Sequence, residues 1–423
     1  MKRLLLMAAL VALAAPGAAD AHAILLGTSP ANRTVLSRSP TEIRVTFDDA
    51  IRLGAGNAAV ANANGASILA GAPSVAGHTL ILPLRPGLAA GAYSVRWSIV
   101  AQDGHRQQGV LAFAVGTGAP SPSSILGSSS PLSWTDVALR ALYLLGALTA
   151  AGVFAFWLLM RRLFDDGLRP LVARLLFFAL LIAVVGAGGL VQTTTGGTRF
   201  ALSVKLALVI AIAGAAAAAL AAQRAKLVAV SGLCAIALAA IPAFAGHAVD
   251  RDSPRWLAVP ADLLHLGSAA VWIGGLAALF CVLRQGAGGE LARERAARQF
   301  SSVALVSVVV LATSGIGRSL SELDSVSQVW STSYGRVLIV KTALFLPLLG
   351  VGRLNRTLLT AGAVRLTRLV RLELAVLVLI LAAVGLLTDL RPGSESPRPP
   401  AASPAAAPLS GGYAPVAGPA PSR

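Results

Sequence analysis

The chain of 423 residues has room for two or three domains, and its composition is that of a membrane protein: 56% of its residues are hydrophobic, 13% are charged and the mean hydropathy is +0.74. The net charge of +17 does not indicate nucleic-acid binding, because the arginines mostly flank apolar segments, as expected from the orientation rule for membrane proteins. Both cysteines, Cys234 and Cys281, lie in apolar runs and form no Cys-x-x-Cys motif, which argues against a disulfide framework.

The chain begins with the pattern of a secretory signal peptide, residues 1–21. Two basic residues precede a short apolar stretch, and Ala19 and Ala21 provide the small residues at the two positions that a signal peptidase recognises. The stretch is too short for a membrane anchor. Cleavage after Ala21 would make His22 the first residue of the mature chain, with a free α-amine attached to its imidazole.

Residues 22–117 are predicted to form one small all-β domain of about 100 residues. Short segments with alternating apolar and polar residues are separated by clusters of Gly, Pro and Asn. This pattern is typical of an antiparallel sandwich or barrel. The predicted strands are 41–47, 78–84, 92–100 and 108–115.

The rest of the chain divides into a linker, a membrane part and a tail. Residues 118–133 are rich in Gly, Ser and Pro and are predicted to be flexible, and the Pro/Ala-rich residues 392–423 are predicted to be disordered. Residues 134–391 contain eight apolar segments long enough to cross a hydrocarbon core of about 30 Å as helices. These segments lie near 136–160, 172–193, 199–222, 226–246, 257–284, 299–319, 334–354 and 367–389.

Positive charges predict the orientation of these spans. If the β domain is exported, the first span enters from outside and alternate loops are cytoplasmic. The cytoplasmic loops then hold fifteen Lys and Arg residues and the outer connections five, which agrees with the positive-inside rule. Trp134, Trp256 and Trp330 fall at the outer boundary, as in an aromatic belt.

The membrane part contains two similar segments, 199–210 (RFALSVKLALVI) and 335–346 (GRVLIVKTALFL), each with a central lysine, Lys205 or Lys341. We expect these lysines to snorkel or to pair with carboxylates between helices. Spans one to four and five to eight are therefore predicted to be parallel repeats in a 4+4 arrangement. Apolar helices also resemble one another by composition alone, so that alternative stays open.

The exported region contains a candidate metal site. Asp103 and His105 flank Gly104, and in an extended chain residues two apart face the same way. Together with the amine and imidazole of His22 they would form a tetragonal N,O ligand set, which suits Cu(II). Asp-Gly-His alone is more often a plain turn. His78 begins a strand and is expected at the surface.

Residues 22–115 resemble the CopC family of periplasmic copper-binding proteins through HAILLGTSPANRTVL, RVTFDDAI, AYSVRWSIVAQDGH and GVLAFAV. The resemblance implies a Greek-key β-sandwich with a Cu(II) site made by the amine and imidazole of His22, by His105 and by Asp103. Family members often add an acidic residue at the position of Asp49, whose strand parity with Phe47 agrees with this role, while Asp48 is expected to face water. A solvated strand end explains Asp49 equally well.

Some CopC-like proteins carry a methionine-rich Cu(I) site, and this chain departs from that pattern. Methionine occurs only at Met1, Met7 and Met160, outside the predicted mature β domain. A Cu(I) site made of thioethers is therefore excluded from that domain.

Three ionisable residues near the outer end of the membrane part are candidates for a copper path, because such residues are costly within spans. His247 ends the fourth span, and His265 lies about 13 Å deeper along the fifth. Asp262 shares a helical face with His265, Ala269 and Trp272, and is expected to orient the imidazole or to bind the ion itself. The alternatives are an interfacial His247 and a helix-packing His265.

The membrane part resembles the CopD family through 241–250 (IPAFAGHAVD), 256–280 (WLAVPADLLHLGSAAVWIGGLAALF) and 334–356 (YGRVLIVKTALFLPLLGVGRLNR). The resemblance implies a copper permease in the plasma membrane, usually linked to uptake when it is fused to a CopC-like domain. Cu(I) and Cu(II) both remain open as the ion bound in this part.

The sequence thus predicts a copper acquisition protein of the plasma membrane, with the β domain and the tail on the periplasmic side and a cytoplasmic copper acceptor that the sequence does not identify. One alternative is a membrane haem protein with His247 and His265 as axial ligands, although their unequal depths argue against a shared haem. Another is a membrane-anchored copper storage or resistance module without transport. No nucleophile–base pair indicates an enzyme.

Overall fold

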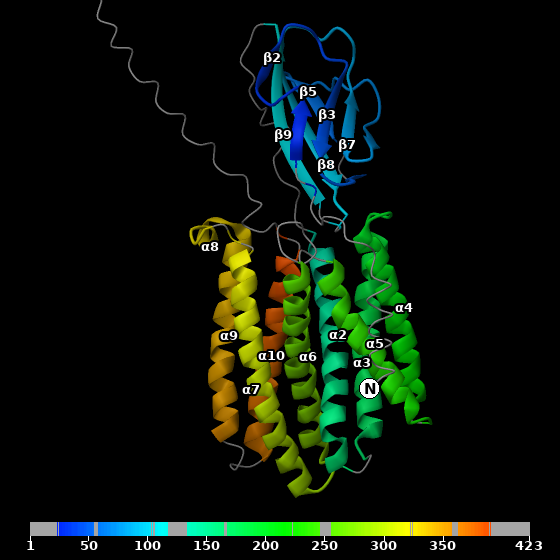
Figure 1. Cartoon of the computed structure of the whole chain (residues 1–423), viewed down its shortest axis with the longest axis vertical. Helices are drawn as coiled ribbons and strands as arrows, with labels where there is room; N and C mark the ends of the chain where they lie inside the picture. The colour runs from blue at the N-terminus through cyan, green and yellow to red at the C-terminus, as the bar shows by residue number, and fades with distance from the viewer. Residues whose placement is uncertain are drawn as a thin grey trace, which may run out of the picture.

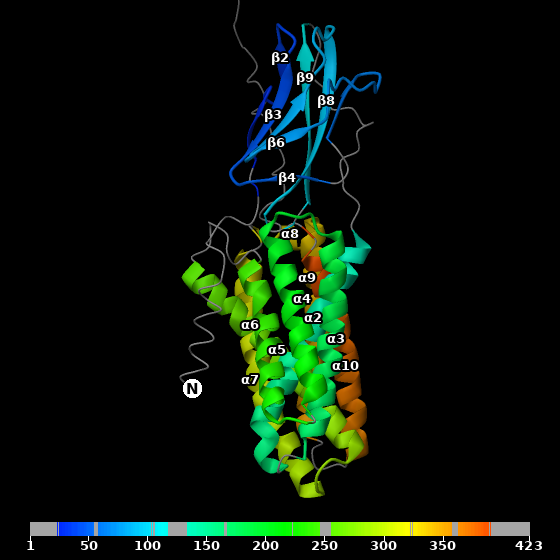
Figure 2. The same ribbon diagram turned by 90° about the vertical axis from the view of Figure 1, so that its right-hand side faces the viewer.

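The computed structural model describes residues 23, 25–54, 58–102, 104, 106–116, 133–164, 167–221, 223–245, 255–321, 323, 325–357, 363–388 and 390. The β domain stands on one end of a bundle of long helices (Figure 1), and the view turned by 90° shows the same arrangement (Figure 2). The predicted signal peptide, linker and tail lie outside the described residues, apart from Ser133 at the start of the first long helix. They stay predictions.

The β domain consists of two sheets around one core. The first has the order β1-β3-β7-β6, and the second has the order β2-β9-β8-β4 with β5 also paired to β8. All strand pairs are antiparallel except β2–β9. Neighbours such as β3 and β7 are far apart in the chain, as in the predicted Greek-key sandwich. The strands are β1 Leu25–Ser29, β2 Thr34–Leu36, β3 Glu42–Phe47, β4 Arg52–Leu53, β5 Ala59–Asn62, β6 Ser74–Ala76, β7 Thr79–Pro83, β8 Gly91–Val100 and β9 Arg106–Val115.

The inner face of β3 confirms the strand alternation predicted for 41–47. Ile43, Val45 and Phe47 are all fully buried. The ring of Phe47 meets the edge of Trp97 from the second sheet, with centroids 5.3 Å apart and an interplanar angle of 74°. Apolar side chains from both sheets thus interdigitate, and their burial is the main source of stability for a domain of this size.

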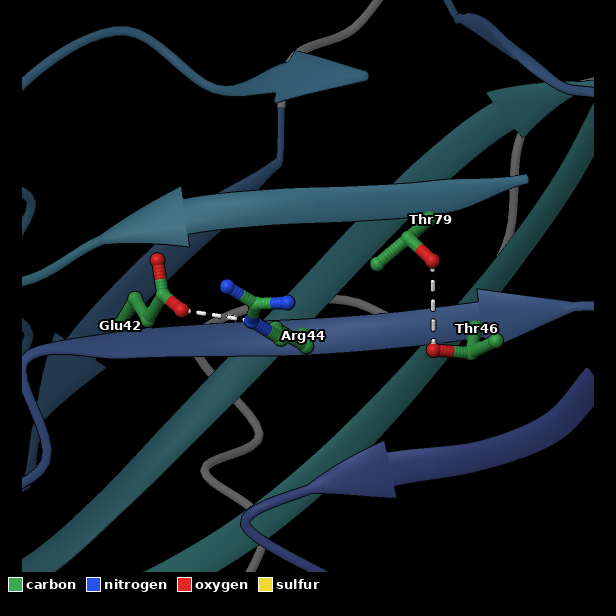
Figure 3. A network of polar contacts seen from close by, with 4 residues as sticks. All are labelled: Glu42, Arg44, Thr46 and Thr79. Carbon is green, nitrogen blue, oxygen red and sulfur yellow. Dashed lines mark hydrogen bonds and ion pairs between the residues drawn. The ribbon is translucent and has the colours of Figure 1, made fainter. Parts of the chain in front are cut away.

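The outer face of β3 is polar, as Figure 3 shows. The Nε of Arg44 lies 2.6 Å from Oε1 of Glu42 on the same face of the strand. The hydroxyl groups of Thr46 and its cross-strand partner Thr79 lie 3.4 Å apart. The Glu42–Arg44 ion pair is exposed and contributes little to stability, whereas the Thr46–Thr79 contact is partly buried.

The second half of the chain is helical and spans the membrane. Eight helices among the described residues are long and apolar enough to cross a bilayer, which confirms the eight predicted spans. Helix α7 begins well before the predicted span, because a charged first segment continues the helix beyond the apolar region. The helices are α2 Trp134–Met160, α3 Arg169–Thr193, α4 Arg199–Leu220, α5 Lys226–Ala245, α6 Arg255–Gln285, α7 Glu290–Ser321, the short α8 Gln328–Ser331, α9 Ser333–Thr357 and α10 Ala363–Leu387.

Helix α2 is central to the bundle and contacts α3, α5, α6 and α10. It approaches α6 closely where Gly152 faces Gly274. A Cβ atom built on Gly274 would collide with the carbonyl of Thr149 and would lie 2.7 Å from the Cα of Gly152. Small residues allow this close backbone packing, which is a common way for membrane helices to associate.

The predicted 4+4 repeat is not confirmed. Helices α3 and α4 pack closely together, whereas their counterparts α7 and α9 make few contacts with each other. Lys205 is exposed on α4, while Lys341 on α9 is half-buried. The repeat therefore stays a prediction.

Candidate functional site

The candidate ligands differ in whether the structure describes them. His22, Asp103, His105 and His247 lie outside the described residues, so their roles stay predictions. Asp49, Asp262 and His265 are described and are treated below. Within the described part of the chain, no group of three or more His, Cys, Asp or Glu side chains is arranged to hold a metal ion.

The described neighbours of the predicted copper ligands belong to ordered parts of the β domain. Ala23, next to His22 in the sequence, is 3% exposed and belongs to the core. Gly104 lies in a turn between β8 and β9, where its N–H donates to the carbonyl of Ala101 at 3.0 Å and its φ is +84°. This φ favours glycine. Strand β9 begins at Arg106; Asp103 and His105 lie outside the described residues, so the expectation that they face the same way stays a prediction.

The segment that contains Asp49 lies beside this turn. The side-chain amide of Gln102 donates to the carbonyl of Ala50 at 3.1 Å, which joins the β8–β9 turn to the end of β3. Strand β3 ends at Phe47, and Asp48 and Asp49 are both half-buried. Burial therefore does not distinguish Asp48 from Asp49, strand parity does not extend to them, and the expectation that Asp48 faces water stays a prediction. What does support Asp49 is its position next to the turn.

Backbone hydrogen bonds on both sides hold the Asp48–Asp49 segment against the turn between β6 and β7. The N–H of Phe47 donates to the carbonyl of His78 at 2.9 Å, and the N–H of Ile51 donates to the carbonyl of Gly77 at 3.1 Å. His78 is exposed, as predicted.

The β8–β9 turn also contacts the membrane part. The N–H of Phe200, in the first turn of α4, donates to the carbonyl of Gln102 at 3.0 Å. Nη2 of Arg52 on β4 donates to the carbonyl of Gly197 at 3.5 Å. The sequence analysis missed these residues, because no local pattern indicates which loop meets which helix end.

In the membrane part, His265 of α6 is held by a residue of α7 that the sequence analysis did not single out. Its Nδ1 lies 2.9 Å from Oγ of Ser314. The Ser314 hydroxyl lies 2.6 Å from the carbonyl of Val310 and donates its single hydrogen there. We therefore assign the tautomer in which Nδ1–H of His265 donates to Ser314, which leaves on Nε2 the lone pair that a metal ion needs.

The rest of this face of α6 is directed into the bundle. Asp262, one turn before His265, is 7% exposed, and Trp272 is 3% exposed. The ring of Trp272 packs edge-on against Phe345 of α9, with centroids 5.9 Å apart. Lys341 of α9 is close enough to His265 to interact with it electrostatically. Ser314 is thus the described hydrogen-bond partner of His265 Nδ1, and the role expected of Asp262 stays a prediction.

The sulfur-containing side chains considered as metal ligands in the membrane part lie on three different helices. Cys234 on α5 and Cys281 on α6 are free, half-buried thiols. Met160 is fully buried at the end of α2. Buried thiols and thioethers in such places normally serve packing.

Comparison with known families divides the chain as the fold does. Residues 25–116 match the CopC domain, and residues 294–387 match the family described as Copper resistance protein D. One chain thus contains a CopC domain and a CopD domain, the second within the membrane helices.

Two characterised proteins are similar in sequence. "Copper transport protein CutJ" of Bacillus subtilis (strain 168) is 27% identical over 419 residues, which cover 91% of this chain and 76% of that protein. "Copper resistance protein D" of Pseudomonas syringae pv. tomato is 31% identical over 173 residues, which cover 36% of this chain and 56% of that protein.

Two solved structures also show likeness. The crystal structure of CopC from Methylosinus trichosporium OB3b is matched with a TM-score of 0.20 and 22% identity, over 22% of this chain and 93% of that one. The structure of PcoC, a methionine-rich copper resistance protein from Escherichia coli, is matched with a TM-score of 0.20 and 24% identity, over 23% of this chain and all of that one.

Proposed function

We propose that this protein acquires copper outside the plasma membrane and imports it. The β domain captures Cu(II), and the helices carry copper inward. The observation that carries the proposal is the position of the β8–β9 turn. It lies beside the segment of Asp49, to which Gln102 is hydrogen-bonded, and it contacts the outer end of α4.

In this proposal the capture site is created by export. Removal of residues 1–21 frees the amine of His22, which binds Cu(II) together with its own imidazole, His105 and Asp103. Nitrogen and oxygen ligands in a tetragonal arrangement favour Cu(II). Asp49 adds a carboxylate from the adjacent segment. The ion is cargo, so its ligands must also allow release.

The first membrane ligands in the proposed path are His247 and His265. The hydrogen bond from Nδ1 of His265 to Ser314 leaves Nε2 for the ion. His265 lies six residues beyond the start of the span at Val259, about 9 Å along the helix. Asp262, buried one turn earlier, supplies negative charge that favours a cation at this depth.

Copper accumulation in cells that express the full chain tests both steps. His105→Ala is expected to lower accumulation at limiting copper at least about tenfold, and high external copper restores it because capture is then no longer limiting. His265→Gln is expected to abolish accumulation at both concentrations. His78→Ala, which changes an exposed histidine of the same domain, is the matched control and leaves accumulation unchanged.

Two results would overturn the proposal. Variants that accumulate more copper than the wild type would mean that the chain exports the metal. Accumulation that is the same with and without His265 would mean that the membrane helices only anchor the copper-binding domain.

A further inference from the structure

Two parts of the chain provide hydrogen-bond acceptors for the N–H groups in the first turn of α4. The first N–H groups of a helix have no partner within it. The hydroxyl of Thr198 accepts from the N–H of Ala201 at 3.0 Å. The N–H of Phe200 instead donates to the carbonyl of Gln102 at 3.0 Å. A membrane helix is thus completed by the backbone of the β domain.

The side chain of Phe200 lies against the same turn. A Cβ atom built on Gly104 would be only 2.6 Å from Cδ1 and 3.0 Å from Cβ of Phe200. No side chain fits at position 104 while the two parts stay in contact. Gly104 separates Asp103 from His105, so the ring touches the backbone between two predicted copper ligands.

The ring of Phe200 is also held from the membrane side. The guanidinium of Arg140 on α2 lies over it, 5.1 Å from the centroid. Nη1 of Arg140 in turn donates to the carbonyl of Thr388, just beyond α10. Phe200 therefore connects the β8–β9 turn with the outer ends of three helices, α2, α4 and α10.

A second contact lies beside the first. Arg52 of β4 pairs with Val100 at the end of β8, and its guanidinium reaches the carbonyl of Gly197 at 3.5 Å. The lower ends of β8 and β9 reach the bundle in both views (Figures 1 and 2).

We propose that residues 194–200 with Arg140 form a docking site for the β8–β9 turn, and that copper passes from the β domain to the membrane helices only in this docked state. The partner is the chain's own copper-binding domain. The inference rests on the proposed function in taking this turn to carry copper, but the docking contact can be tested without copper.

A cross-link measures docking. Arg52→Cys and Gly196→Cys, in a chain whose Cys234 and Cys281 are replaced by alanine, are joined by a short bifunctional thiol reagent. Gly196 is exposed, and a Cβ atom there meets nothing within 4 Å. The two cysteine substitutions remove the long hydrogen bond between Arg52 and Gly197 but leave the contact between Gln102 and Phe200 intact.

The matched control pairs Asn64→Cys with Gly196→Cys. Asn64 is exposed and follows β5, whose Asn62 pairs with Tyr93. Tyr93 is seven residues up β8 from Val100, about 23 Å away. We expect efficient cross-linking from position 52 and only background from position 64.

Two variants disturb docking from opposite sides. Gly104→Ala introduces the colliding methyl group, and Phe200→Pro removes the N–H donor and the ring at a helix position that tolerates proline. Each is expected to lower the cross-linking rate and copper accumulation at least about fivefold.

Cu(II) binding to the purified full-length Phe200→Pro protein, followed by electron paramagnetic resonance, is expected to match the wild type. The docking proposal is overturned if position 52 cross-links no better than position 64. It is also overturned if Phe200→Pro abolishes cross-linking and leaves copper accumulation unchanged. A wild-type protein that cross-links normally but binds no Cu(II) would contradict the proposed function instead and leave the docking contact standing.

Discussion

At the scale of single residues, the hydrogen bond between His265 and Ser314 determines which imidazole nitrogen of His265 is free to bind a metal ion. In the assigned tautomer the Ser314 hydroxyl gives its hydrogen to Val310 and accepts one from Nδ1 of His265. Partners of this kind fix the tautomer and orientation of metal-binding histidines. The lone pair of Nε2 is then available for copper.

Replacing Ser314 by alanine is expected to reduce the initial rate of copper accumulation about 10- to 100-fold, because the imidazole loses the acceptor that fixes its tautomer. Ser314→Thr keeps the hydroxyl and is expected to retain most of the rate.

Ser307→Ala is the matched control for that prediction. Ser307 lies two turns earlier on α7 and donates to the carbonyl of Val303 at 3.0 Å, the same type of hydrogen bond as that from Ser314 to Val310. Equal rates for the Ser307 and Ser314 alanine variants would show that the His265–Ser314 contact has no role in transport.

The sequence allowed His265 to be selected, because an ionisable side chain within an apolar span stands out. Ser314 was not selected. Serine is common in such helices, and only the packing of α7 on α6 brings this one to the imidazole. Asp49 was named by resemblance. Asp49 lies close to the β8–β9 turn because Gln102 donates a hydrogen bond to the carbonyl of Ala50. No spacing of residues in the sequence predicts this contact.

At the scale of elements, the close crossing of α2 and α6 organises the membrane part. Gly152 and Gly274 let the two backbones meet there. Van der Waals packing between small residues is a major source of helix association in lipid, where the hydrophobic effect does not drive helices together.

Gly274→Ala is expected to destabilise the helix bundle by about 1–3 kcal/mol through overpacking against Thr149 and Gly152. The measurement is the thermal unfolding temperature of the full-length protein in detergent. Gly267→Ala, on the same helix and with open space around the added methyl group, is the control and is expected to leave the temperature unchanged or to raise it. A fall of equal size in both variants would contradict the account of the crossing.

Periodicity accounts for the elements that could be predicted. The eight apolar runs became helices, and the alternating segments 41–47 and 78–84 became β3 and β7. Alternation fails on β8, where Ser94 and Ser98 are buried along with the apolar residues and the side chain of Gln108 donates to Ser98 at 3.3 Å. Strands as short as β4 contain too few residues for a periodic pattern to emerge.

At the scale of the whole molecule, the β domain and the membrane helices are in contact rather than joined only by the linker. Composition predicted two parts and a flexible connection. It did not predict that the carbonyl of Gln102 caps α4, because that contact depends on the relative position of two domains. A fixed contact at the β8–β9 turn would place captured copper at the outer end of the bundle.

The central claim is that removal of the signal peptide builds the Cu(II) site on the amine of His22. The most direct measurement is electron paramagnetic resonance of the full-length protein titrated with Cu(II), comparing a mature chain that begins at His22 with one that carries a single extra glycine before it. The account predicts that the added glycine abolishes the tight, nitrogen-rich Cu(II) signal, because the amine is displaced from the site. An identical signal and affinity in both proteins would show that the amine is not a ligand and would contradict the account.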